Sequence, residues 1–210
     1  MPPALLSFEY AFEPSSLTSA PPLLLLHGTG GNEHDLLTLG RTLSPGSALL
    51  SPRGKVSERG AARFFARLAE GVFDPTEVAQ RTDELADFVT AAANRHQIDI
   101  TRLIAVGFSN GANIAATLLL IRPIVLAGAV LIRPMVVVDR PASPDSLAGK
   151  RVLILSGDQD PLVPADHPRR LAAHLRAGGA AVNLETFPAS HALTRNDIAA
   201  AQSWLTSPIL

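Results

Sequence analysis

Short strand-forming runs alternate with longer helical patterns along most of this 210-residue chain. The first run, PLLLLHG at residues 22–28, is too short to cross a membrane and is typical of a strand buried on both faces. Similar runs predict strands at residues 48–54, 102–107, 126–134, 151–157 and 181–187, and helical patterns occupy residues 61–70, 76–95, 110–121, 165–177 and 195–204. Strands separated by helices predict an α/β fold, in which a mostly parallel central sheet carries helices on both faces.

The chain shows no internal repeat, low-complexity tract or linker, so residues 1–210 are expected to form a single domain. Residues 5–12 are expected to add an antiparallel edge strand. The composition, 47% hydrophobic and 18% charged, is that of a globular protein. The most apolar stretch, residues 118–138, contains Arg122, Pro123, Arg133 and Pro134, so we do not expect it to span a bilayer.

Charge and cysteine content exclude several classes of protein. The formal net charge of -1 gives no electrostatic reason to expect nucleic acid or a membrane as partner. The chain has no cysteine, which excludes disulfides, thiolate zinc sites and a cysteine nucleophile. No basic segment opens the chain, and Glu9 and Glu13 interrupt its first apolar residues. We therefore expect a cytoplasmic protein.

A serine stands between two glycines where a predicted strand meets a predicted helix. The residues Gly107, Phe108, Ser109, Asn110 and Gly111 match the pattern G-x-S-x-G. In that pattern a tight, strained turn lifts the serine hydroxyl clear of the sheet and points the helix N-terminus at it. The position predicts that Ser109 is a nucleophile; the plainer alternative is a serine that only caps the helix.

A serine nucleophile needs a base to take its proton and a carboxylate to orient that base. In folds of this type the order along the chain is Ser, Asp, His. Asp158 and Asp160 both follow the strand at 151–157, and we favour Asp160 because the later position can turn back toward the site. His191 follows the last strand and precedes the last helix, where the base is needed. The other histidines suit surface, packing or loop-holding roles: His27, His34, His96, His167 and His174.

The oxyanion formed during attack needs two hydrogen-bond donors. One is expected to be the backbone N–H of Asn110, directly after the nucleophile. The other is expected from the glycine-rich loop HGTGG at residues 27–31, and we assign it to the N–H of Thr29. A phosphate cradle is the rival interpretation of this loop, but the required lysine and spacing are missing. No metal or other cofactor is expected.

These motifs, in order, resemble the phospholipase/carboxylesterase branch of the α/β-hydrolases: HGTGGNEHDLL, LSPRGKV, GFSNGANIAATLLL, GDQDPLVP and SHALT. That branch includes small bacterial serine esterases and, more distantly, acyl-protein thioesterases. The likeness runs from about Pro22 to Trp204 and implies an α/β-hydrolase fold and a cofactor-free Ser–Asp–His hydrolase of esters or thioesters. Ser190 stands where relatives usually have glycine, and cousins closer to the dienelactone hydrolases use cysteine at the position of Ser109.

Five residues are candidates for the walls of the substrate pocket. Arg53, Arg63, Phe64 and Phe65 could form an apolar floor with a cation at its rim, and Met135 could face the pocket. The alternative is that the phenylalanines and Met135 pack in the core and the arginines lie on the surface. The connection at residues 135–150 leaves room for a minimal lid at most, which favours small esters.

Three functions stay open. A carboxylesterase-type serine hydrolase acting on a small-molecule ester is the preferred one. A thioesterase or lysophospholipase would need a longer acyl groove, and a non-catalytic ligand-binding protein would not need the three catalytic residues. An exposed apolar patch at Met135 to Val138 could also support a homodimer.

Overall fold

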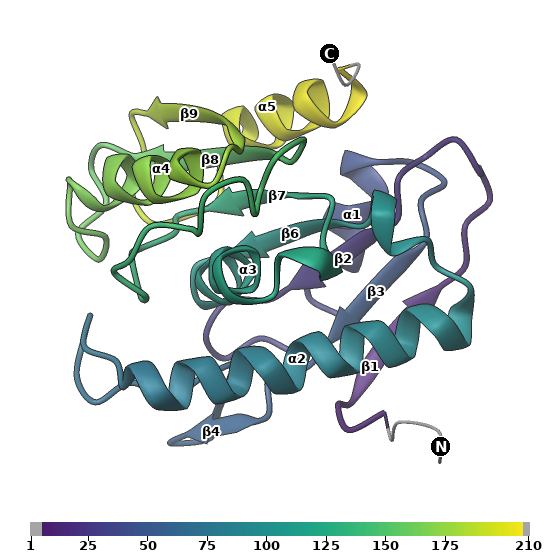
Figure 1. The fold of residues 1–210 in the computed structure, drawn as a ribbon, viewed down its shortest axis with the longest axis horizontal. Coiled ribbons are helices and arrows are strands. Elements are labelled where there is room, and N and C mark those ends of the chain that lie inside the picture. Colours follow the sequence, from purple (N-terminus) through teal and green to yellow (C-terminus); the bar gives the residue numbers. More distant parts are fainter. Residues whose placement is uncertain (1–5, 208–210) are drawn as a thin grey trace.

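A seven-stranded sheet forms the centre of the computed structural model, which describes residues 6–207 (Figure 1). The strand order is β1-β3-β2-β6-β7-β8-β9. Every neighbouring pair is parallel except β1 and β3, which are antiparallel. The strands are β1 (Tyr10–Glu13), β2 (Leu23–Leu26), β3 (Leu49–Pro52), β6 (Ile104–Phe108), β7 (Gly128–Ile132), β8 (Arg151–Gly157) and β9 (Ala181–Phe187).

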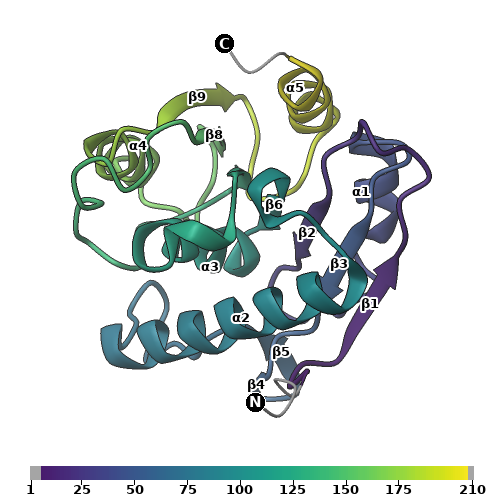
Figure 2. The same cartoon turned by 45° about the vertical axis from the view of Figure 1, so that its right-hand side comes forward.

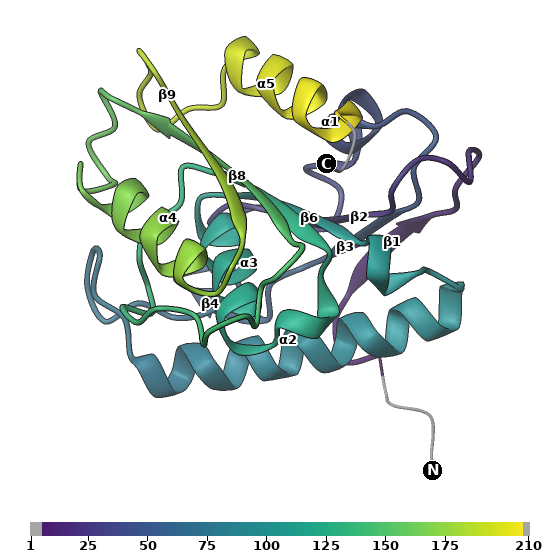
Figure 3. The same cartoon turned by 45° about the horizontal axis from the view of Figure 1, so that its top comes forward.

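Helices cover both faces of this sheet, as predicted (Figures 2 and 3). Helices α1 (Leu37–Leu43) and α5 (Arg195–Thr206) contact each other on one face. Helices α2 (Pro75–His96), α3 (Asn110–Ile121) and α4 (His167–Ala177) lie on the other. Within residues 6–207 no helix combines the length and the apolar character that crossing a bilayer requires.

Strand β2 shows how the sequence builds both layers of the core. Leu24 and Leu26 pack into the cluster formed with α2, α3 and α4, whereas Leu23 and Leu25 pack into the cluster formed with α1 and α5. All four side chains are fully buried. Successive side chains of a strand point to opposite faces, so an unbroken apolar run suits a strand with a hydrophobic layer on each side.

Helix α2 has clear start and stop signals. The Asp74 carboxylate accepts a hydrogen bond from the N–H of Thr76, and Pro75 occupies the first helical position, where a missing N–H costs nothing. Gln97 ends the helix in the left-handed conformation. The buried residues recur at helical spacing along one face: Val78, Thr82, Leu85, Ala86, Phe88, Val89, Ala92 and Ala93.

The prediction of a helix at residues 61–70 was wrong. Residues 61–63 instead form β5 (Ala61–Arg63), the second strand of a hairpin whose first strand is β4 (Val56–Glu58). Arg59 and Gly60 both have positive φ at the turn, which matches the right-handed twist of a tight hairpin. Residues after β5 run on as an irregular loop into α2.

Two smaller differences lie near the N-terminus. The predicted edge strand is present but shorter, since β1 begins at Tyr10 and pairs antiparallel with β3; residue 5 lies outside the described residues. Helix α1 was not predicted, because seven residues with Gly40 at their centre and no side-chain cap give a weak helical signal.

The connection between β7 and β8 contains no helix over residues 133–150, as expected for a site without a large lid. The apolar patch predicted within it is not exposed. Met135 and Val136 are buried, and Val137 and Val138 are half-buried against the core. The exposed apolar surface from which a homodimer was inferred is therefore not present at this segment.

Candidate active site

Ser109 occupies a strained turn between β6 and α3. Its dihedral angles are φ 53° and ψ −115°, so its backbone has the strained conformation that the motif predicts. A Cβ on Gly107 would lie 2.5 Å from the Gly111 carbonyl oxygen, and one on Gly111 would lie 1.9 Å from the Leu26 carbonyl oxygen. Both glycines are therefore required by the close approach of helix α3 to the strands beneath it.

The structure brings Ser109, His191 and Asp160 together across 82 residues of sequence. The Nε2 atom of His191 lies 2.8 Å from Ser109 Oγ, and its Nδ1 atom lies 2.8 Å from Asp160 Oδ2. An ionised carboxylate only accepts, so Nδ1 carries the proton and Nε2 is free to accept the serine proton. The His191 side chain is 20% exposed and that of Asp160 is 2% exposed, so the base faces the solvent side while the acid is enclosed.

Asp160 rather than Asp158 reaches the histidine. The second carboxylate oxygen of Asp160 accepts hydrogen bonds from the N–H groups of Leu162 (2.8 Å) and Val163 (3.2 Å). These two donors fix the carboxylate with its other oxygen toward His191. Asp158 is exposed, and its backbone N–H donates to the Phe187 carbonyl.

The two predicted oxyanion donors lie beside the nucleophile. Among residues 6–207 neither the Thr29 nor the Asn110 N–H has an intramolecular acceptor, and both residues line the cavity that contains Ser109. The Asn110 N–H is free because the first N–H groups of a helix have no partner within it. The Thr29 hydroxyl accepts a 2.6 Å hydrogen bond from the Arg63 guanidinium, which holds the loop at this point.

His27 holds the glycine-rich loop. Its Nε2 accepts a hydrogen bond from the Gly54 N–H at 2.9 Å, so Nδ1 must carry the proton that it donates to the Gly28 carbonyl at 2.7 Å. Burial lowers the pKa of His27, which favours this neutral form. The ring is thus a structural link between the loop after β2 and the loop after β3.

The cavity at Ser109 has a volume of about 240 Å³. Its lining includes Arg63 and Met135, two of the predicted wall residues. The prediction was wrong for Arg53, Phe64 and Phe65, which lie outside it. The Arg53 guanidinium is paired with Glu33 and Glu9, and both phenylalanines are buried in the core. The remaining lining residues are Gly28, Thr29, Arg67, Glu70, Phe73, Phe108, Asn110, Asn113, Leu162 and His191.

Asn113 is a cavity residue that the sequence did not single out. It lies one helical turn after Ser109, on the same side of α3, and its Oδ1 accepts a hydrogen bond from the Met135 N–H. The spacing of four residues from the nucleophile was the available signal. Asn113 therefore joins the first turn of α3 to the end of the β7 segment.

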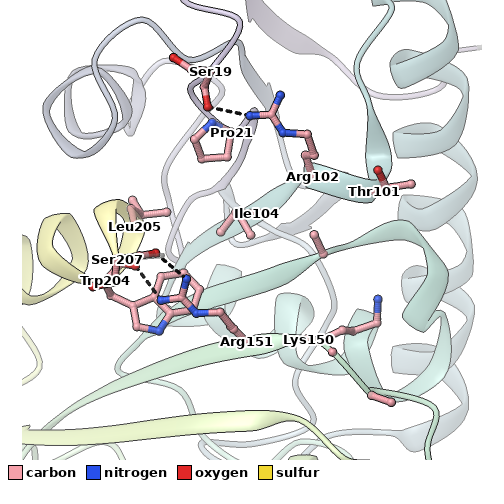
Figure 4. A pocket seen from close by; sticks show the side chains of 13 residues that line it. Ser19, Pro21, Thr101, Arg102, Ile104, Lys150, Arg151, Trp204, Leu205 and Ser207 are labelled. Atoms are coloured by element: carbon pink, nitrogen blue, oxygen red, sulfur yellow. Dashed lines mark hydrogen bonds between the residues drawn. The ribbon is translucent and has the colours of Figure 1, made fainter. Parts of the chain in front are cut away.

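A cavity of about 360 Å³ lies at the opposite, amino ends of the strands (Figure 4). Arg102 donates to the Thr18 and Ser19 carbonyls, and Arg151 donates to the Trp204 and Ser207 carbonyls. These guanidinium groups hold a loop and the end of α5. Ligand sites of parallel sheets lie at the carboxyl ends of strands, so the cavity at Ser109 is the candidate active site.

Comparisons with known proteins agree on one family. The sequence model of the dienelactone hydrolase family matches residues 9–204. The MhqD protein of Bacillus subtilis, whose name assigns it provisionally to the hydrolases, is 48% identical over 193 residues, covering 92% of this chain and 96% of its own.

Two solved structures extend this likeness. A carboxylesterase of Bacillus cereus superposes with a TM-score of 0.91 at 41% identity, covering 95% of this chain and 93% of its own. A carboxylesterase of Mesorhizobium loti gives a TM-score of 0.88 at 33% identity, covering 96% of this chain and 95% of its own. The predicted α/β-hydrolase fold and the resemblance to carboxylesterases are thereby confirmed.

Proposed function

This chain belongs to the dienelactone hydrolase family, and from that premise we propose that it cleaves carboxylic esters through an acyl-enzyme formed on Ser109. The observation that carries the proposal is the hydrogen-bonded chain from Ser109 through His191 to Asp160. It stands at the carboxyl end of β6, beside two free backbone donors and an open cavity. The carboxylesterases that this chain resembles support the choice of ester as substrate.

The proposed cycle has two halves. His191 Nε2 takes the proton of Ser109 Oγ as that oxygen bonds to the ester carbonyl carbon, and the carbonyl oxygen becomes an oxyanion held by the N–H groups of Thr29 and Asn110. The bond to the alkoxide then breaks, and His191 returns the proton to the leaving alcohol. Water, activated by the same histidine, attacks the acyl-enzyme and releases the carboxylic acid and Ser109.

Serine at this turn makes the base indispensable. A cysteine thiol is partly ionised near neutral pH, whereas a serine hydroxyl is a poor nucleophile until a base removes its proton. For this chain we therefore expect His191 to matter about as much as Ser109.

The size of the cavity favours short acyl groups. At about 240 Å³ it falls below the ~300–1,000 Å³ that is usual for sites enclosing a drug-sized ligand. Leu162 at its edge is exposed, and the β7–β8 connection adds no helix over residues 133–150 to cover a long chain. We expect acetate and butyrate esters to be better substrates than octanoate.

The test is a stopped-flow and steady-state assay with p-nitrophenyl acetate, butyrate and octanoate. Ser109→Ala and His191→Ala should each lower kcat by about 10³-fold or more, since members of such a triad act as a unit. Ser57→Ala and His34→Ala are matched controls at exposed positions away from the cavity, and they should behave like the unaltered protein.

Each contrary outcome has a distinct meaning. Full activity in Ser109→Ala would refute the nucleophile. Preference for octanoate and for long thioesters would favour the thioesterase or lysophospholipase alternative. Saturable binding of the esters with no release of p-nitrophenol would favour a non-catalytic ligand-binding protein.

A further inference from the structure

A buried arginine stands directly after strand β7. Arg133 has φ 55°, in the left-handed region that arginine rarely adopts, and its side chain is 0% exposed. Its partner, Asp197 in the first turn of α5, is also 0% exposed. Charged side chains are seldom buried so completely. Strained backbone is in addition commonly found at functional sites.

The Arg133 guanidinium uses all five of its N–H groups. Nε donates to the Ser190 carbonyl at 2.9 Å, and the two terminal nitrogens donate to both carboxylate oxygens of Asp197 at 2.9 and 2.8 Å. The remaining donors reach the Ala192 carbonyl at 3.1 Å and the Leu155 carbonyl at 3.3 Å. An arginine has five donors in a fixed planar fork, so this environment is saturated.

Two of these acceptors flank the histidine of the site. Ser190 and Ala192 are the residues immediately before and after His191, in the loop between β9 and α5. The same guanidinium therefore hydrogen-bonds to the backbone on both sides of His191. Asp197 adds a second hold, because its carboxylate accepts from the N–H and hydroxyl of Thr194 in the capping box that starts α5.

The nucleophile is attached to the same point. The Ser109 N–H donates to the Ile132 carbonyl at 2.9 Å, and Ile132 immediately precedes Arg133. The end of β7 thus holds the backbone of Ser109 through one residue and the backbone of His191 through the next. A rigid link of this kind would fix the distance between Oγ and Nε2.

We infer that Arg133 is a positioning residue, which holds the His191 loop so that the imidazole stays in line between Asp160 and Ser109. This inference rests on the proposed function of Ser109 and His191. The competing view is that Arg133 and Asp197 form a stabilising ion pair with no bearing on the imidazole. The two views separate because Arg133 donates directly to the residues on either side of His191, whereas Asp197 contacts the loop only at Thr194, three residues after His191.

Three variants exploit that difference. Asp197→Asn leaves the buried guanidinium without its counter-charge, so Tm should fall. The arginine donors to Ser190 and Ala192 remain, and the amide oxygen can still accept from Thr194. Arg133→Met removes the donors and leaves a buried carboxylate unpaired, which should lower Tm strongly. The double variant Arg133→Met/Asp197→Asn removes the donors without leaving a buried charge, so much of Tm should return.

The first measurement is kcat and KM for p-nitrophenyl butyrate, corrected for the folded fraction. We expect kcat to fall by about 10- to 100-fold in Arg133→Met and equally in the double variant, because misplacing a catalytic group by about 1 Å costs that much. KM should change by less than about twofold, since no substrate contact is lost. Asp197→Asn should keep most of kcat, and Arg133→Lys should recover part of it.

The second measurement does not depend on turnover. The ¹⁵N NMR shifts of the His191 ring report which nitrogen carries the proton. The unaltered protein and Asp197→Asn should show the proton held on Nδ1 by Asp160, whereas Arg133→Met and the double variant should show a mixture of tautomers. Leu85→Ala, a cavity-forming change in α2, serves as a control that lowers Tm without altering the ring.

The outcomes separate the inference from the proposed function. If kcat and the ring tautomer recover together with Tm in the double variant, the ion pair is only structural and the inference is wrong. If the unaltered protein fails to hydrolyse esters but the tautomer still changes with Arg133→Met, the proposed function is wrong while Arg133 does hold the imidazole.

Discussion

Replacing Gly111 with alanine would place a methyl group 1.9 Å from the carbonyl oxygen of Leu26. Gly111 lies in the first turn of α3, and Leu26 ends β2, the strand next to β6. The contact is with backbone on a central strand, which cannot swing aside as the end of a side chain can. The helix must therefore move, and Ser109 moves with it.

The size of the effect follows from the distance. Real Cβ atoms essentially never come closer than 3.0 Å to such an atom, so the first turn of α3 must retreat by about 1 Å. Overpacking of a core costs about 1–3 kcal/mol, and the ~1 kcal/mol that alanine gains over glycine inside a helix offsets only part of this. The free energy of unfolding of Gly111→Ala should therefore fall by up to about 2 kcal/mol. A displacement of about 1 Å between Ser109 and His191 should lower kcat/KM by roughly 100-fold.

Urea denaturation and hydrolysis of p-nitrophenyl butyrate would measure the two effects in the same preparation. Gly40→Ala in α1 is the matched control, because its Cβ would meet only side-chain methyl groups, of Leu25 at 2.8 Å and of Leu49 at 3.1 Å. Those methyl groups can shift, so its activity should be unchanged. If Gly111→Ala is as stable and as active as Gly40→Ala, the claim that close packing fixes the turn is wrong.

Two further predictions concern the glycine-rich loop. Burial lowers the pKa of His27 below its ordinary value of 6.5, so protonation favours the unfolded chain. The free energy of unfolding should therefore fall as pH drops below about 6.5, and it should fall less steeply in His27→Gln; parallel urea titrations from pH 8 to 5 would show this, and identical slopes would contradict it. Arg63→Met removes the donor to the Thr29 hydroxyl, so kcat for p-nitrophenyl butyrate should drop by about 10-fold, less than the ~100-fold or more expected for losing an oxyanion donor itself. An unchanged kcat would mean that the loop holds Thr29 without Arg63.

The sheet and the three polar residues beyond the carboxyl ends of its strands could be predicted because both depend on local sequence patterns. Unbroken apolar runs such as Leu23–Leu26 indicate strands covered on both sides, and the chain order of a parallel sheet then constrains where strand ends meet. Ser109, Asp160 and His191 each follow a strand, so they could be expected at one edge of the sheet before any contact was known.

The pocket walls could not be predicted in the same way, because burial and pairing depend on distant segments. Phe64 and Phe65 give the same sequence signal whether they line a cavity or fill the core. Arg53 forms ion pairs with Glu9 and Glu33, which lie 44 and 20 residues away along the chain, and these pairs hold its side chain outside the cavity. Arg133 gave no signal at all, since its partner Asp197 is 64 residues distant.

The hairpin that the sequence did not predict explains how the oxyanion donors are held. The Ala62 carbonyl accepts from the Gly30 N–H at 2.9 Å, next to Thr29, and the Phe64 N–H donates to the Asn110 side chain at 2.8 Å. A helix at 61–70 would have turned most of these backbone groups inward to its own hydrogen bonds. In an extended segment these backbone groups point away from the chain on both sides. Residues 62–64 can therefore hydrogen-bond to both the Thr29 loop and the start of α3. The departure from helical structure at this point is therefore what allows residues 62–64 to brace both sides of the proposed oxyanion hole.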